Sequence, residues 1–60
     1  MFEITIKNYN AGDGVTYEEY HNIKSYHTTP NETWLVMYDT DGFTFYVKVE
    51  QILEFYVEKV

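Results

Sequence analysis

His21 and His27 are the two imidazole side chains of this chain and its first candidates for metal binding. Imidazole nitrogens combined with carboxylate oxygens suit zinc or nickel. The carboxylates that we consider as their partners are Glu18, Glu19, Asp39 and Asp41. The spacing of the two histidines matches no defined ligand motif, so it favours two partly exposed side chains, His27 in a strand and His21 near a helix end. We therefore expect no metal site.

The segment from Asp39 to Gly42, Asp-Thr-Asp-Gly, resembles part of a calcium-binding loop. A complete loop of that kind needs further oxygen ligands and a distal Glu at fixed offsets, which the residues from Phe43 onward do not supply. Asp and Gly at these positions are typical of a turn between two strands. We therefore interpret the segment as a hairpin turn.

Side chains suited to catalysis are scarce in this chain. It has no Cys, its one Ser is Ser25, and its three Gly residues form no phosphate-binding pattern. The adjacent carboxylates Glu18 and Glu19 would diverge on a helix, and a domain of this size offers little pocket for acid–base chemistry. We expect a non-enzymatic protein without a cofactor.

Aromatic residues are abundant, with seven Tyr, four Phe and one Trp. Tyr and Trp contribute strongly to protein interfaces, so an aromatic surface rimmed by acidic groups would suit a protein partner. The alternative is that the aromatic side chains fill a small core, because each buries a large area. The first interpretation assigns partner binding to Trp34, Tyr38 and Tyr46 as anchors and to Glu18, Glu19, Glu50, Glu54 and Glu58 as acidic groups.

The formal net charge of the chain is −6, from ten acidic residues and four basic residues that are all Lys. Binding to a phosphate backbone depends on neutralisation by Lys and Arg, so we do not expect direct nucleic-acid binding. An acidic surface favours a basic site on another protein instead. Lys without Arg, together with many Asn, Tyr and Ile residues, is typical of AT-rich coding sequences such as those of low-GC bacteria and their phages.

We interpret residues 1–60 as one small domain, which at this length buries only about 60% of the surface that its unfolded chain exposes. Chains of this size usually gain stability from disulfides, a metal or a second subunit, and the absence of Cys removes the first of these. We therefore expect a homodimer or a bound protein partner. No membrane span or signal segment is predicted, so a cytoplasmic location is the default expectation.

The N-terminal part of the chain alternates apolar and polar residues, which predicts a half-buried strand over Phe2–Lys7. The following residues, 8–14, are rich in Asn, Gly and Asp and predict a loop. The strand is therefore expected to end before Asn8.

The next segment has two interpretations. Thr16 and Glu19 have the spacing of a capping box, which predicts a short helix over Tyr17–Asn22 and then a strand over Ile23–His27. Tyr and Asn are poor helix formers, however, so the competing interpretation is a strand that begins at Tyr20 or Ile23 and ends at Thr28. We favour the helix followed by the strand, and expect a turn around Pro30 after it.

Two aromatic and β-branched runs, 34–38 and 43–49, predict a hairpin. If Gly42 takes a left-handed bulge position, one face is Leu35, Met37, Phe45 and Val47, and the other is Trp34, Val36, Tyr38, Tyr46 and Lys48. A two-residue turn at Asp41 and Gly42 would instead shift the register by one and combine Trp34, Val36 and Tyr38 with Phe45 and Val47. In both registers the second face is apolar enough that we expect it to be covered.

The C-terminal segment fits two structures. As a helix, it would share one apolar face among Val49, Ile52, Leu53, Tyr56, Val57 and Val60. As a strand, Leu53, Phe55 and Val57 would alternate with polar neighbours. The helix lacks an N-cap, and the Phe-Tyr-Val run favours a strand. We favour a helical turn near Glu50–Ile52 followed by a strand.

Together these patterns predict an α+β fold that is mainly antiparallel β, a meander of four to five strands with one short helix. Fold alone implies no function. The leading hypothesis is a small acidic binding protein, such as a phage-encoded inhibitor or modulator, that occupies a basic site on a host protein. The alternative is a structural module that acts by homo-oligomerisation through an edge strand.

Overall fold

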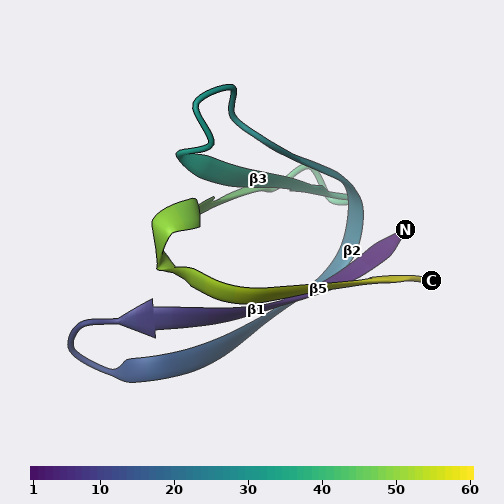
Figure 1. Ribbon diagram of the computed structural model, residues 1–60. Coiled ribbons are helices and arrows are strands. Elements are labelled where there is room, and N and C mark those ends of the chain that lie inside the picture. The colour runs from purple at the N-terminus through teal and green to yellow at the C-terminus, as the bar shows by residue number, and fades with distance from the viewer.

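The computed structural model describes residues 1–60 as one strongly curled, five-stranded antiparallel sheet (Figure 1). Its elements are β1 (Phe2–Asn10), β2 (Gly14–Thr28), β3 (Trp34–Asp39), β4 (Thr44–Lys48), the 3-10 turn η1 (Val49–Gln51) and β5 (Ile52–Lys59). The order in the sheet is β4-β3-β2-β1-β5, so four strands form a meander and β5 crosses over to pair with β1. The fold is mainly β, as expected, but the α+β class is wrong because the chain contains no α-helix.

The helix that we expected over residues 17–22 is absent, because these residues belong to β2. The capping-box spacing is a local signal, whereas β1 offers residues 17–20 of this segment paired neighbours. Ile4 lies opposite Tyr20, and Ile6 lies opposite Glu18. A helix this short depends on tertiary packing for stability, and the two Tyr residues of the segment suit a sheet better.

Two irregularities bend β2 and let one strand serve both halves of the sheet. His21 and Asn22 together oppose Glu3 on β1, and Asn22 has the left-handed φ of 57°. A second register shift follows between Ile23 and Ser25, where β2 begins to pair with β3. Extra residues of this kind bend the bulged strand and increase its twist. The first half of β2 therefore pairs with β1, and the second half turns away to pair with β3.

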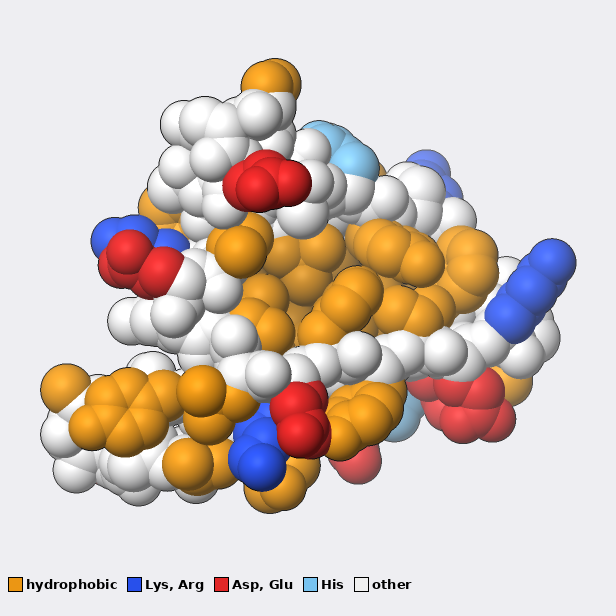
Figure 2. Space-filling model, viewed as in Figure 1, with side chains coloured by type: hydrophobic (Ala, Val, Ile, Leu, Met, Phe, Trp, Pro, Cys, Tyr) orange, Lys and Arg blue, Asp and Glu red, His pale blue; other side chains and the backbone are white.

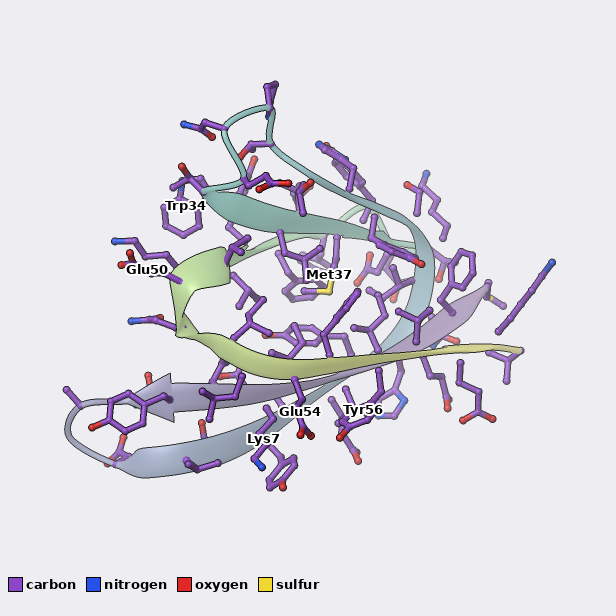
Figure 3. The ribbon with its side chains drawn as sticks, viewed as in Figure 1. Lys7, Trp34, Met37, Glu50, Glu54 and Tyr56 are labelled. Atoms are coloured by element: carbon purple, nitrogen blue, oxygen red, sulfur yellow. The ribbon has the colours of Figure 1, made fainter.

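The core lies inside the curl of the sheet. Its buried residues are Ile4, Ile6, Ile23, Leu35, Met37 and Val47, and the partly buried residues around them are Phe2, Tyr20, Phe45, Val49 and Ile52. Figure 3 shows the Met37 side chain pointing into the space that the sheet encloses. The core is small because only nine of the 60 residues are buried.

The β3–β4 hairpin has the first of the two expected registers, with Met37 opposite Phe45 and Leu35 opposite Val47. The buried Asp39 carboxylate stabilises the turn, because its Oδ1 accepts hydrogen bonds from the backbone N–H groups of Asp41 and Phe43, both at 2.9 Å. Gly42 has the positive φ of 91° that this turn requires. The turn expected around Pro30 is also present, between β2 and β3.

The C-terminal segment contains the turn and strand that we favoured, with the turn at residues 49–51. Val57 pairs with Ile4 and Phe55 pairs with Ile6, so both lie on the inner face of the sheet. β1 extends to Asn10, three residues further than predicted, because it pairs with β2 on one side and β5 on the other. No helix in the structure has the length and apolarity needed to cross a membrane.

Candidate protein-binding surfaces

A groove of about 230 Å³ lies between the β1–β2 hairpin and the segment formed by β4 and η1. The hairpin contributes Asn8, Asn10, Glu18 and Tyr20, and the opposite side contributes Trp34, Tyr46, Val47, Lys48 and Gln51. We call it the aromatic groove. It exists because β1 and β2 extend beyond the part of the sheet that pairs with β5 and β3, so their inner face is left facing β4.

Trp34 and Tyr46 form one wall of the aromatic groove. Their rings are in edge-to-face contact, with centroids 6.3 Å apart and an interplanar angle of 88°. The side chains remain accessible, since Trp34 is 39% exposed and Tyr46 is 64% exposed. An aromatic pair in this geometry is favourable. It offers a partner a large apolar surface together with two polar groups, the indole N–H of Trp34 and the hydroxyl of Tyr46.

Glu18 lies in the same groove and is held by two neighbours. The Asn8 amide donates a hydrogen bond to its Oε1 at 3.2 Å, and the Tyr20 hydroxyl donates one to its Oε2. Asn8 is only 5% exposed, and its own Oδ1 has no donor. A carboxylate can accept about four hydrogen bonds, so Glu18 retains the capacity to accept more from a cationic group.

Burial raises the pKa of Tyr20 well above its ordinary value, and the hydrogen bond to Glu18 and the charge of that carboxylate raise it further. Tyr20 therefore stays protonated even in moderately alkaline solution and keeps donating to Glu18. This fixed donor orients the carboxylate, because a hydrogen bond to an ionised acceptor is stronger than one between neutral groups.

The rim of the aromatic groove carries both charges. Lys48 Nζ lies 3.3 Å from a carboxylate oxygen of Glu50, and both side chains are largely exposed. The Glu50 carboxylate neutralises the charge of Lys48, which is the one basic side chain that lines the groove. Together with Glu18 the local charge is negative, which favours a cationic ligand.

Tyr38 shares the outer face of β3 with Trp34 but does not line the aromatic groove. Its ring stacks on His27 of β2, with centroids 5.6 Å apart and an interplanar angle of 22°. Between these aromatic residues Val36 is only 3% exposed, with Tyr46 and His27 as its cross-strand neighbours. The chain's own side chains thus cover the middle of the face that we expected another chain to cover.

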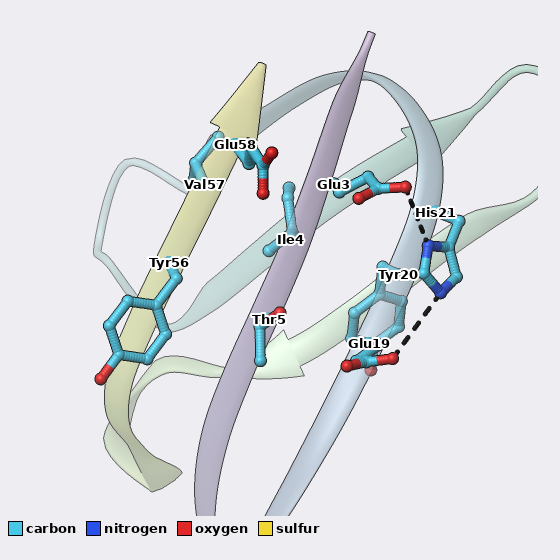
Figure 4. Close-up of a pocket in the computed structure, with 9 residues that line it drawn as sticks. All are labelled: Glu3, Ile4, Thr5, Glu19, Tyr20, His21, Tyr56, Val57 and Glu58. Atoms are coloured by element: carbon cyan, nitrogen blue, oxygen red, sulfur yellow. Dashed lines mark hydrogen bonds and ion pairs between the residues drawn. The ribbon is translucent and has the colours of Figure 1, made fainter. Parts of the chain in front are cut away.

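A second hollow, of about 390 Å³, lies where β5, β1 and β2 run side by side (Figure 4). We call it the acidic hollow because Glu3, Glu19 and Glu58 line it. His21 lies between two of these carboxylates, with Nδ1 3.3 Å from Glu3 and Nε2 3.8 Å from Glu19. Glu58 lies directly opposite Glu3 in the sheet, an arrangement of like charges that is mildly unfavourable. The structure contains no group of three or more His, Asp or Glu side chains arranged to hold a metal ion.

Glu54 lies on the outer face of β5, opposite Lys7 of β1. Its carboxylate accepts a hydrogen bond from the hydroxyl of Tyr56, which raises the pKa of Tyr56. Lys7 in turn lies 6.0 Å from the centre of the Tyr17 ring. Figure 3 shows Lys7, Glu54 and Tyr56 on the side of the sheet that faces away from Met37.

The structure therefore divides the residues predicted to bind a partner between two surfaces. Trp34, Tyr46 and Glu18 meet in the aromatic groove, with Glu50 at its rim and Tyr38 on the adjoining face. The others, Glu19, Glu54 and Glu58, lie on the outer surface of β2 and β5. Eight residues expected to act together are thus separated into two groups.

Sequence reasoning missed Asn8 and Tyr20, which position Glu18. A signal was present, because Asn8 continues the alternation of Ile4 and Ile6 and so places an amide on an apolar face. A buried amide needs hydrogen-bond partners, and those partners had to come from the strand beside it.

Comparisons with protein-family models, curated proteins and solved structures find no match to this chain.

Proposed function

We propose that this chain is a non-enzymatic binding protein that holds a basic segment of a partner protein in the aromatic groove. Acting as an inhibitor or modulator, it would occupy a basic site on that partner. The single observation that carries the proposal is the Glu18 carboxylate, fixed by Tyr20 and Asn8 beside the exposed Trp34–Tyr46 pair.

The chemistry of the groove favours an Arg or Lys side chain as the group that enters it. A guanidinium donates several hydrogen bonds in one plane and stacks on aromatic faces, so it can use a carboxylate and an indole together. Asn8 lines the same groove, and its Oδ1 is buried without a partner. A small movement of the amide would offer it to the same cation.

The charge of the whole chain supports this proposal. A net charge of −6 attracts a basic partner over a distance and speeds encounter, and salt screens the attraction. The acidic hollow contributes to this long-range attraction without contacting the bound segment. Binding should therefore weaken as salt concentration rises.

The test uses a short synthetic peptide with one Arg between Ser residues, and the same peptide with neutral citrulline in place of Arg. In a titration followed by NMR, the Arg peptide should shift the indole N–H of Trp34 and the ring signals of Tyr46. The citrulline peptide keeps the shape of the side chain but replaces one guanidinium nitrogen by a carbonyl oxygen and loses the charge, so it should bind about tenfold or more weakly.

Two variants of the protein separate the groove from general acidity. Glu18→Gln removes one charge inside the aromatic groove, and Glu54→Gln removes one charge on the outer face of β5. The first should weaken binding of the Arg peptide by about tenfold, and the second by less than about twofold. Equal losses, or shifts centred on the acidic hollow, would show that the groove is not the binding site.

A further inference from the structure

The strand β5 is bonded to the sheet on one side only, because its single neighbour is β1. Met1 and Val60 exchange two backbone hydrogen bonds, at 2.9 Å and 3.4 Å, which marks them as a hydrogen-bonded pair. Such pairs alternate along an antiparallel ladder. Phe55, Val57 and Lys59 of β5 therefore lie at the positions between the bonded pairs. Their N–H and C=O groups point away from β1.

An apolar groove of about 200 Å³ adjoins this free edge. Thr28, Leu35, Val49, Ile52 and Phe55 line it, and we call it the edge groove. Figure 2 shows hydrophobic side chains gathered between β3 and β5 on this face of the molecule. An added strand would thus find free backbone groups along β5 and an apolar surface beneath its inward side chains.

The devices that usually protect edge strands lie only at the two ends of β5, as a register shift beside Leu53 and as Lys59. β5 spans eight residues and contains no Pro, and its one Lys is the last residue of the strand. Edges of this length are normally shortened, interrupted or marked by inward charges. Inward-facing Phe55 and Val57 are 41% and 37% exposed, so apolar area remains beside the unpaired backbone.

We propose that β5 pairs antiparallel with β5 of a second copy of this chain, about a two-fold axis at Val57. This register pairs all three outward residues at once, with Val57 opposite its own counterpart and Phe55 opposite Lys59 of the other copy. A register centred on Tyr56 would place Glu54 opposite Glu58, and like charges directly opposite are unfavourable. A register centred on Phe55 would rely on Leu53, which lies at a register shift.

Side chains on the outer face also complement each other in this register. Tyr56 would lie opposite Glu58 of the other copy, so its hydroxyl, which donates to Glu54 within one chain, could donate to a carboxylate across the interface. By symmetry this contact occurs twice. The proposal goes beyond the aromatic groove, which lies beside β4 and stays free in such a dimer.

The test is sedimentation equilibrium of the intact chain from micromolar to millimolar concentration, comparing Tyr56→Glu with Tyr17→Glu. Both side chains are exposed on the outer face, but Tyr17 lies on β2, with β1 between it and β5. Tyr56→Glu places four carboxylates at the interface and should weaken dimerisation about tenfold, whereas Tyr17→Glu should change it less than about twofold. Tyr56→Lys should tighten it, because Lys then faces Glu58.

A second measurement keeps every side chain in place. Chemical synthesis with an N-methyl group on the Val57 amide removes a donor that faces away from β1, so the fold should survive, as circular dichroism would verify. Dimerisation should be lost. A wild-type chain that stays monomeric at millimolar concentration, or a dimer unaffected by N-methylation, would overturn the proposal. Salt provides a further distinction, because screening of two −6 chains should strengthen the dimer while it weakens binding of the Arg peptide.

Discussion

The strands β3 and β5 each contain five apolar or aromatic residues but have very different surroundings. Four of the six residues of β3 are buried, whereas none of the eight residues of β5 is. The difference follows from the sheet order, since β3 lies between β2 and β4 while β5 has β1 alone. Between these two strands, burial therefore follows the number of neighbouring strands.

This contrast separates the parts of the chain that hold the fold together from the parts that can contact a partner. The centre of β3 supplies Leu35 and Met37 to the core, and the turn after it is fixed by Asp39. The aromatic groove and the free edge of β5 lie at the margins of the sheet. Substitutions in the first set should affect the free energy of unfolding, and substitutions in the second set should affect binding.

The largest expected effect comes from truncating the core of β3. Met37 is fully buried, so Met37→Ala should lower the free energy of unfolding by about 2 to 5 kcal/mol, which is a large part of the stability of a domain this small. Leu53→Ala in β5 should lower it by less than about 1 kcal/mol, because Leu53 is 52% exposed. Urea unfolding of both variants measures the difference, and similar losses would remove the contrast between the strands.

The next effect concerns the turn that ends β3. Asp39→Ala leaves two backbone N–H groups without their acceptor and should cost about 2 kcal/mol. Asp41→Ala is the matched control, because Asp41 is exposed in the same turn and should change stability by less than about 0.5 kcal/mol. If both variants unfold at the same urea concentration, the Asp39 carboxylate does not stabilise the turn.

Gly42 tests the turn after β3 through its backbone, with Gly12 of the β1–β2 turn as the control. Gly42→Ala introduces a Cβ at a φ of 91° and should cost about 1 kcal/mol, although no atom lies near the added group. Gly12→Ala, in the β1–β2 turn, also meets no neighbour and has no positive φ in this region, so it should be nearly neutral. Thermal unfolding of the two variants measures the cost of backbone strain, because neither added Cβ meets a neighbour. If Gly42→Ala unfolds at the same temperature as the wild-type chain, the positive φ causes no strain in the variant.

The smallest effect depends on pH. Because the pKa of Tyr20 is raised above its ordinary value of 10.0, the folded chain holds this proton more tightly than the unfolded chain. The resulting stabilisation is present in full below pH 10 and is lost as pH rises through the folded pKa. Tyr20→Phe should cost about 0.5 to 1 kcal/mol at neutral pH and less at higher pH. Parallel stability curves for the two proteins would contradict this.

The sequence predicts well those elements whose signals are local. The alternation of Phe2, Ile4 and Ile6 predicts β1, and the turn residues before Phe43 predict the hairpin, with one of the two registers considered being the observed one. The two-way interpretation of the C-terminus was also resolved correctly, because a helix there would have had no cap. In each case the residues that decide the structure lie within one strand or one turn.

The sequence predicts poorly what depends on contacts between distant segments. Residues 17–22 form a strand because β1 lies beside them, whereas the capping-box spacing of Thr16 and Glu19 favoured a helix. The same pairing brings Asn8 to Glu18 and separates Glu19 from it, since neighbouring residues on a strand face opposite sides. The candidate residues were therefore correct in type, but their grouping into two surfaces followed only from the strand register.

Residue-resolved amide hydrogen exchange tests most directly whether β5 is bonded to the sheet through one edge and open at the other. In dilute protein, exchange should be slow at Tyr56 and Glu58, whose amides face β1, and fast at Phe55, Val57 and Lys59. In concentrated protein, the three fast amides should become slow as a second copy pairs with them. Uniform exchange rates along β5 in dilute protein, or fast exchange that persists at high concentration, would contradict the arrangement described here.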